Sequence, residues 1–257
     1  MHYILSIGKG GCIPLKIIRT KDYEDMSRKA AGVIAAQVVL KPDSILGLAT
    51  GSTPIGAYKQ LIAWGRAGDL DFSEIRTFNL DEYRGLTRDN DQSYFYFMRH
   101  NFMDGAGIPV ERTDIPDGSE PDAERECARY DAAIRAAGGI DLQLLGMGHN
   151  GHIGFNEPAD EFPKGTHCVD LTASTIEANK RFFASEADVP RQAYTMGIQT
   201  IMSARKILVA VSGEDKADIV YKAFFGPVTP LVPASILQMH PDVIVVADEA
   251  ALSRCKL

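Results

Sequence analysis

The 257-residue sequence lacks several features that mark membrane, secreted or nucleic-acid-binding proteins. No apolar run approaches the roughly 20 residues that a membrane-spanning helix needs. The four cysteines are scattered, with no C-x-x-C pair and no Cys/His cluster at metal-binding spacing, so we expect reduced thiols, a cytoplasmic location and no metal site. The net charge of −7 disfavours a nucleic-acid partner, because phosphate binding usually leaves a basic footprint.

Internal repeats, low-complexity tracts and a convincing linker are also missing. With 45% hydrophobic and 24% charged residues, the composition is that of a globular chain with one sizeable core. We therefore expect a single domain over residues 17–257. Residues 1–16 are a leader of unclear role: the apolar run at 4–7 is too short for a signal peptide, and a disordered leader, an upstream start codon or an added edge strand are all compatible with it.

Hydrophobic patterning predicts strands that alternate with helices. We expect buried strands at residues 44–49, 75–80, 140–145, 206–211 and 243–247, and shorter strands at 168–171 and 193–198. We expect helices at 22–37, 55–64, 90–102, 124–137 and 174–183, helices that begin at 212 and 233, a turn at 201–205, and an aromatic cluster at 94–97 that lies mainly in the core. This alternation is typical of an α/β protein, here a single-domain Rossmann-like three-layer sandwich with a mostly parallel central sheet.

A glycine-rich loop after the predicted strand 140–145 carries the densest group of polar side chains. Three glycines let the chain turn sharply or let a ligand approach its backbone: Gly146, Gly148 and Gly151. His152 and Glu157 follow in the same loop as Asn150. A histidine beside a carboxylate transfers protons near neutral pH, and loops at the ends of parallel strands hold ligands.

The same glycines fit the dinucleotide-binding pattern Gly-x-Gly-x-x-Gly. That pattern requires a helix to open directly afterwards, whereas Gly154 and Pro158 lie where this helix would run. We therefore disfavour a nucleotide site. A structural glycine turn with a non-catalytic His152 is a second alternative, which the density of polar groups makes the weaker one.

The turn at residues 50–54 has the features of an anion site. It follows a predicted strand and opens a predicted helix, and it combines Gly51 with the hydroxyls of Thr50, Ser52 and Thr53. Backbone N–H groups at a helix N-terminus attract anions, so we expect a phosphate cradle here. An ordinary capped helix is the alternative.

Charged residues at three further positions are candidates for the same site. Asp81 and Glu82 follow the predicted strand 75–80, where catalytic groups belong in a parallel sheet, although either could cap the next turn. Lys216 follows a later strand and can send its ammonium group back over the strand ends. Arg181 lies on a predicted helix. A solvated surface cation is the alternative for both.

Three motifs together resemble the glucosamine-6-phosphate deaminases: Leu-Ala-Thr-Gly-Ser-Thr-Pro at 48–54, Phe-Asn-Leu-Asp-Glu-Tyr at 78–83, and Gly-x-Asn-Gly-His-Ile-Gly-Phe-Asn-Glu-Pro at 148–158. The resemblance runs from about residue 17 to about residue 251, with the motifs in the family's order. It implies an enzyme of amino-sugar catabolism, a hydrolase acting on a C–N bond. Its reaction converts glucosamine 6-phosphate and water to fructose 6-phosphate and ammonia, without metal or organic cofactor.

The resemblance also implies roles for the candidate residues. His152, oriented by Glu157, opens the sugar ring, and Asp81 moves a proton between C2 and C1, with Glu82 as a neighbour that tunes it. Arg181 lies in a helical lid. The sugar phosphate is bound by Thr50, Gly51, Ser52, Thr53, Gly146, Arg181 and Lys216.

Two positions depart from the family's common pattern. Ser52 stands where glycine is usual, a change that leaves the backbone donors of the turn in place. Asn150 stands where many members have aspartate, although another branch has asparagine. An amide cannot accept a proton, so a full Asp-His-Glu relay is not available, but Asn150 can still hold His152 by a hydrogen bond.

The resemblance also bears on regulation and assembly. Allosteric members bind N-acetylglucosamine 6-phosphate between subunits through cationic side chains, and the matching positions here are His167 and Val169. Valine cannot contact a phosphate, and neutral histidine is a weak substitute for arginine. The chain also ends at Leu257, without the longer tail of those oligomers. We therefore expect hyperbolic kinetics without activation, and a monomer or small homo-oligomer.

Two alternative functions belong to similar folds. A 6-phosphogluconolactonase has a similar Gly-His step but lacks the continuation at 155–158 and the motif at 78–83. A non-catalytic sugar-phosphate-sensing domain of a repressor would come with a DNA-binding helix-turn-helix, for which residues 1–16 are too short. It would also have no need for Asp81, His152 and Glu157 together. The resemblance favours the gluco over the galacto substrate, while physical reasoning does not decide between them.

Overall fold

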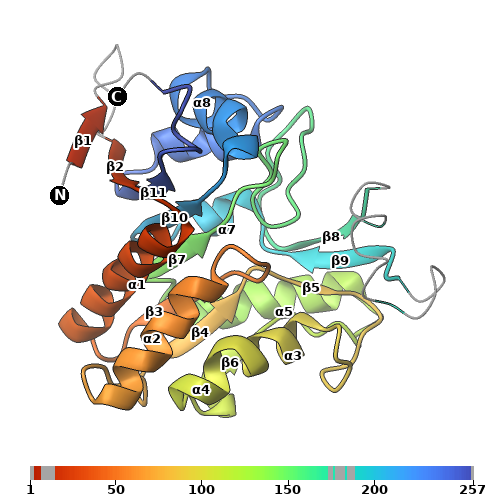
Figure 1. Ribbon diagram of the computed structural model, residues 1–257. Coiled ribbons are helices and arrows are strands. Elements are labelled where there is room, and N and C mark those ends of the chain that lie inside the picture. The colour runs from red at the N-terminus through yellow and green to blue at the C-terminus, as the bar shows by residue number, and fades with distance from the viewer. Residues whose placement is uncertain (1–2, 7–14, 173–175, 177–182, 184–188, 256–257) are drawn as a thin grey trace.

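The structure is a computed structural model that describes residues 3–6, 15–172, 176, 183 and 189–255. Its centre is an eight-stranded sheet in which all neighbouring strands are parallel except the first pair (Figure 1). In spatial order the strands are β1 (Tyr3–Ser6), β2 (Leu15–Thr20), β11 (Val243–Asp248), β10 (Ile207–Val211), β7 (Leu142–Leu145), β3 (Ile45–Leu48), β4 (Arg76–Asn79) and β6 (Thr113–Asp114). The predicted mostly parallel sheet is confirmed.

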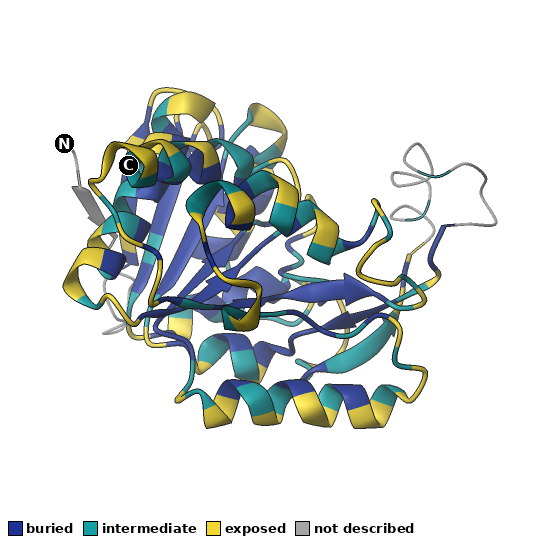
Figure 2. Cartoon of the chain, turned by 90° about the horizontal axis from the view of Figure 1, so that it is seen from below, coloured by how far each residue is buried: buried dark blue, intermediate teal, exposed yellow. Residues whose placement is uncertain are grey.

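Helices lie on both sides of this sheet, so it is the middle of three layers (Figure 2). The α-helices are α1 (Tyr23–Leu40), α2 (Ile55–Ala67), α3 (Tyr94–Met98), α4 (Asp104–Ala106), α5 (Ala123–Ala136), α7 (Ile198–Met202) and α8 (Ala217–Phe225). A π-helix, η1 (Arg99–Met103), and the 3-10 helices η2 (Val110–Arg112), η5 (Glu214–Lys216) and η6 (Pro233–Met239) complete the set. Strands β3, β7 and β10 are buried along their whole length, as expected when helices cover both faces.

A second, three-stranded antiparallel sheet extends from the end of the main sheet (Figure 1). It consists of β5 (Asp81–Tyr83), β9 (Gln192–Thr195) and β8 (His167–Asp170). The sequence had placed Asp81 at the end of a main-sheet strand. Instead, the Leu80 N–H donates to the Leu48 carbonyl at 3.1 Å, after which the chain leaves the main sheet and Asp81 pairs with Thr195.

The predictions for residues 1–16 and for the helix at 174–183 have different outcomes. Residues 3–6 form an edge strand antiparallel to β2, one of the three possibilities for the leader. The predicted helix at 174–183, including Arg181 and the helical lid, lies outside the described residues apart from Ile176 and Phe183. In the part of the chain that the structure describes, no helix is long and apolar enough to cross a membrane.

Several local predictions are wrong. The predicted turn at 201–205 starts two residues too early, because α7 continues to Met202 and the turn covers only residues 203–205. The predicted helix at 90–102 begins only at Tyr94 and continues as a π-helix. The aromatic cluster within it is not mainly core: Tyr96 is 43% exposed, and Tyr94 is half-buried against Tyr83 and Phe155. The last predicted helix is a 3-10 helix.

The core next to the 50–54 turn contains a buried tyrosine with a specific polar role. The ring of Tyr58 is fully buried and stacks on Phe102 with centroids 4.7 Å apart. Its hydroxyl donates to the Ala49 carbonyl at 2.6 Å and accepts from the Ala49 N–H at 3.2 Å. Tyr58 thereby satisfies the backbone at the point where β3 gives way to the turn.

We expect Tyr58→Phe to lower the free energy of unfolding by about 1–3 kcal/mol, because the buried backbone groups of Ala49 lose this partner while the ring packing stays. Urea unfolding at constant pH measures the effect. Tyr96→Phe, on an exposed tyrosine of α3, is the matched control and should change stability by less than about 0.5 kcal/mol. Equal stabilities of the Tyr58 variant and the wild type would contradict this role.

Candidate active site

Four adjacent strands of the main sheet, β4, β3, β7 and β10, each lead into one of the predicted site segments. The turn at 50–53 follows β3, and Asp81 follows β4. The loop of residues 146–158, called here the glycine loop, follows β7, and Lys216 follows β10. Because parallel strands present their carboxyl ends at the same edge, these segments meet at one edge of the sheet.

Gly148 and Gly146 of the glycine loop differ in the space next to their backbone. A Cβ at Gly148 would lie 2.3 Å from Cε1 of His152, so the imidazole occupies the space of the missing side chain. The Gly148 N–H also donates to the His152 carbonyl at 2.9 Å, which closes the loop. A Cβ at Gly146 would meet no atom within 4 Å. Packing therefore does not require glycine at 146, which supports the prediction that a ligand approaches the backbone there.

His152, Glu157 and Asn150 form one cluster within the glycine loop. Nδ1 of His152 lies 3.1 Å from Oε1 of Glu157, an ion-pair distance. The Asn150 amide donates to the other Glu157 oxygen, and its own oxygen accepts from the His152 N–H at 3.2 Å. Burial raises the pKa of Glu157, but the contacts with His152 and Asn150 outweigh it and hold this pKa below its usual value. Glu157 is therefore an anion that can stabilise a protonated His152.

Asp81 is a buried carboxylate with an unusual affinity for protons. Its side chain is only 6% exposed, on the first residue of β5. Burial, and then the nearby charge of Glu82, raise the pKa of Asp81 to about 8. A carboxylate of this basicity is suited to take a proton from carbon and return it.

Glu82 has a structural role that the sequence left open. It is 2% exposed, and its carboxylate accepts backbone N–H groups of Tyr83, Tyr94 and Phe95 at 2.8–2.9 Å. Burial raises the pKa of Glu82 to about 7, although these hydrogen bonds and Arg88 favour the anion. Glu82 therefore joins β5 to the first turn of α3, while its charge acts on Asp81.

The strand that carries Asp81 and the glycine loop touch through Thr195. This residue pairs with Asp81 in the small sheet, and its Oγ1 accepts the Phe155 N–H at 3.0 Å. A Cβ on Gly154 would lie 2.8 Å from Thr195 Oγ1 and 3.7 Å from Oδ2 of Asp81. A side chain at position 154 would therefore point toward the Asp81 carboxylate, and glycine leaves the space between the loop and this carboxylate open.

Lys216 and the turn at 50–53 lie at the ends of strands on either side of β7. Nζ of Lys216 donates to the Met147 carbonyl at 3.0 Å, so the ammonium group reaches back over the glycine loop as predicted. Burial lowers the pKa of Lys216. In the turn, Gly51 has a φ of +91° that favours glycine, and Ser52 is exposed. Arg181 lies outside the described residues.

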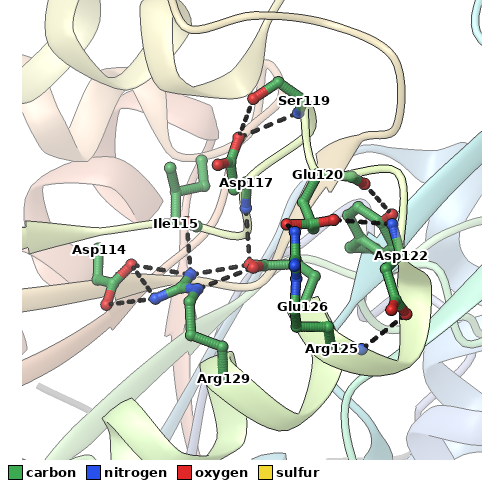
Figure 3. Close-up of polar contacts among 10 residues, drawn as sticks. Asp114, Ile115, Asp117, Ser119, Glu120, Asp122, Arg125, Glu126 and Arg129 are labelled. Atoms are coloured by element: carbon green, nitrogen blue, oxygen red, sulfur yellow. Dashed lines mark hydrogen bonds and ion pairs between the residues drawn. The ribbon is translucent and has the colours of Figure 1, made fainter.

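An ion-pair network around the buried Glu126 holds the segment between β6 and α5 (Figure 3). Glu126 is 2% exposed and accepts from the Asp117 N–H at 2.7 Å and from Nε of Arg129 at 2.8 Å. Arg129 also pairs with Asp114 at 3.4 Å. In the same segment, the Glu120 carbonyl accepts a hydrogen bond from the Tyr194 hydroxyl at 2.6 Å. This bond fixes β9, the strand that pairs with β5.

Sequence reasoning missed some residues that shape the site. Thr195 gave no signal, because the pairing of its strand with Asp81 depends on segments more than 100 residues apart. Tyr94 was assigned to the core, yet its ring stacks on Phe155 of the glycine loop, with the planes 7° apart. Among the described residues, no three His, Cys, Asp or Glu side chains are grouped so as to hold a metal ion.

Comparison with known proteins places this arrangement in a family. The family model for glucosamine-6-phosphate isomerases and 6-phosphogluconolactonases matches residues 21–245. The chain belongs to this family. It is similar to the glucosamine-6-phosphate deaminase of Lachnoclostridium phytofermentans (60% identity over 232 residues, 90% of this chain and 98% of the relative). It is also similar to that of Clostridioides difficile (55% over 240 residues, 93% of this chain and 96% of the relative).

Solved structures of the two kinds of enzyme in this family differ in how similar they are to this chain. A structure described as a monomeric glucosamine-6-phosphate deaminase superposes with a TM-score of 0.89 at 44% identity, and the match covers 93% of this chain and 99% of that one. Structures of several 6-phosphogluconolactonases share only 17–22% identity, with TM-scores of 0.66–0.71, and show the common fold alone. The comparisons therefore favour the deaminase branch, as the motifs predicted.

The raised pKa of Asp81 has a consequence for stability. The folded protein holds the Asp81 proton up to about pH 8, whereas an unfolded aspartate releases it near pH 3.8. Between these pH values the unfolded state is ionised and the folded state is not, so the free energy of unfolding falls as pH rises. Asparagine does not titrate. We expect Asp81→Asn to gain stability relative to the wild type as pH rises from about 5 to 8, by up to about 1.4 kcal/mol per pH unit.

Urea unfolding of both proteins at several pH values measures this difference. Asp160→Asn, on an exposed aspartate, is the control and should show no such trend. A stability difference between Asp81→Asn and the wild type that does not change with pH would show that the Asp81 carboxyl is not desolvated in the folded protein.

Proposed function

We propose that the chain converts D-glucosamine 6-phosphate and water to D-fructose 6-phosphate and ammonia. Relatives described as glucosamine-6-phosphate deaminases are 50–60% identical over 90–95% of this chain. The observation that carries the assignment of roles is the proximity of the two halves of the site. A basic, buried carboxylate, Asp81, lies near Gly154 of the loop that holds the His152–Glu157 pair, and Thr195 joins the two segments.

Phosphate binding precedes the chemistry. Backbone N–H groups of the turn at 50–53 lie at the N-terminus of α2, where an anion is stabilised. Lys216 adds a cation from the end of β10, and the resemblance adds Arg181 from the lid. Gly146 lets the substrate come close to the glycine loop. These groups hold the sugar with its C1–C2 end toward Asp81 and His152.

His152 opens the ring in this proposal. Its imidazole takes the proton of the anomeric hydroxyl and returns it to the ring oxygen, as the C1–O5 bond breaks. Glu157 is an anion 3.1 Å from Nδ1, and its charge stabilises the imidazolium between the two transfers. Asn150 does not transfer a proton; its amide fixes the Glu157 carboxylate.

Asp81 carries out the isomerisation. The carboxylate removes the proton from C2, and the electron pair forms the C1–C2 double bond while the π pair of the C1 carbonyl moves to O1, which takes a proton from the C2 ammonium group. Asp81 then delivers its proton to C1, and the resulting iminium at C2 adds water and releases ammonia. In the free protein Asp81 is largely protonated at neutral pH, but the substrate's ammonium group at C2 lowers the pKa of a neighbouring carboxylate and generates the base.

We further propose that the protein acts as a monomer or small homo-oligomer in the cytoplasm, without allosteric activation. The 44% identical deaminase structure is described as monomeric, which supports this assembly. At the positions where allosteric members carry cations, β8 has Val169 and a histidine, His167, whose Nδ1 lies 3.0 Å from the Gly165 carbonyl. Cys127, Cys168 and Cys255 are free thiols.

Ammonia release from glucosamine 6-phosphate and from galactosamine 6-phosphate tests the activity and its epimer preference. With the preferred substrate, Asp81→Asn should lose turnover by about 10²–10⁴-fold, because the general base is gone, while phosphate-dependent binding remains. Solvent-hydrogen exchange at C2 should fall in parallel. Near-normal exchange at C2 in this variant would exclude Asp81 as the base, and the exposed Asp160→Asn serves again as the control.

The His152→Gln variant separates ring opening from isomerisation. We expect a large loss of turnover on the cyclic sugar, because no group then moves the proton from the anomeric hydroxyl to the ring oxygen. Binding of an open-chain analogue, or exchange at its C2, should stay close to wild type, since Asp81 is intact. Steady-state kinetics and hydrogen exchange on both forms measure the contrast. Equal impairment on both would mean that His152 acts after ring opening.

A further inference from the structure

We infer that Tyr23, on α1, is a positioning residue for the phosphate-binding turn at 50–53. This inference rests on the phosphate role of the turn in the proposed function. None of the three motifs includes Tyr23, which lies 29 residues before Ser52 in the chain. The argument depends on two hydrogen bonds, on a close helix contact and on the absence of a side-chain cap at the start of α2.

The Tyr23 hydroxyl forms hydrogen bonds both to the turn and to the first turn of α2. It donates to the Ser52 carbonyl at 3.0 Å and accepts from the Gly56 N–H, also at 3.0 Å. Gly56 is the second residue of α2, and its N–H has no partner within the helix because it belongs to the first turn. One hydroxyl thus joins Ser52, within the turn, to the helix that follows it.

The first turn of α2 lies unusually close to α1. A Cβ at Gly56 would come 2.3 Å from Oγ of Ser27 and 3.1 Å from the Tyr23 hydroxyl. Ser27 is four residues after Tyr23, so both side chains lie on the same face of α1. Asp22 caps this helix by accepting the Asp25 N–H at 2.9 Å, which fixes the start of α1 where Tyr23 lies.

Within the described residues, few other hydrogen bonds hold the turn. Pro54 occupies the N-cap position of α2 and makes no side-chain capping bond. The Ile55 N–H reaches the Ser52 carbonyl only at 3.4 Å. The Ser52 side chain is exposed, as is Gly51. The bridge from Tyr23 therefore fixes the direction of the backbone N–H groups that are to meet the phosphate.

This role predicts weaker phosphate binding without a change in the chemical step. The phosphate is bound alike in the ground state and in the transition state, so losing its positioning raises KM and leaves kcat in place. Tyr23→Phe removes only the hydroxyl. We expect KM for glucosamine 6-phosphate to rise about three- to tenfold, the range for one hydrogen bond, with kcat within about twofold of wild type.

The experiment compares wild type, Tyr23→Phe and Tyr221→Phe in three measurements. Tyr221 is an exposed tyrosine of α8 that stacks on Phe225, and its variant is the matched control. The measurements are steady-state kinetics, competitive inhibition by inorganic phosphate, and thermal unfolding with and without phosphate. For Tyr23→Phe alone, the inhibition constant of phosphate should rise together with KM, and phosphate should raise the unfolding temperature less.

Each outcome has one meaning. Unchanged KM and phosphate inhibition in Tyr23→Phe would overturn the inference, as would a fall in kcat with KM unchanged. A lower unfolding temperature with normal KM would show that Tyr23 is structural only. A wild type that releases no ammonia would instead contradict the proposed function, and a wild type that is active but not inhibited by phosphate would contradict the role of the turn.

Discussion

Burial of two adjacent carboxylates is the constraint on which the site depends. Asp81 and Glu82 are 6% and 2% exposed, and taking two acids out of water is unfavourable unless they are protonated or bonded. The two solve this problem differently. Glu82 accepts three backbone N–H groups and so orders β5 and α3, whereas Asp81 keeps a high pKa. The structural role of one acid thus leaves the other free to exchange a proton.

The same arrangement explains why a second sheet is present. A carboxylate at the end of β4 would face only the neighbouring strand ends. Because the chain leaves the main sheet at Leu80, Asp81 pairs with Thr195, and the Thr195 hydroxyl then binds the backbone of Phe155 in the glycine loop. The network around Glu126 and Arg129 holds the segment between β6 and α5 (Figure 3), whose Glu120 carbonyl accepts the hydroxyl of Tyr194 in β9. The distance between Asp81 and the glycine loop is therefore set by strand pairing rather than by one flexible turn.

The sequence predicted the features that are local or periodic. Buried strands such as β10 appear as continuous apolar runs, and the glycine loop was recognised because Asn150, His152 and Glu157 lie within eight residues of one another. The pairing of Asp81 with Thr195 could not be predicted, because it joins segments that carry no matching pattern. The exposure of Tyr96 was also missed, since an aromatic stripe looks the same whether it faces a core or a site.

Asn150 shows how a site can keep its geometry when one ionisable group is absent. An aspartate here would add a second negative charge beside Glu157, which would raise the pKa of both acids. The amide instead donates to Glu157 and accepts from the His152 backbone, two contacts that a carboxylate could not make together. Glu157 therefore stays ionised at a depressed pKa, and a single anion faces the imidazole. In the proposed ring opening the imidazole must both accept and release its proton, and Glu157 is the anion of this cluster that faces it.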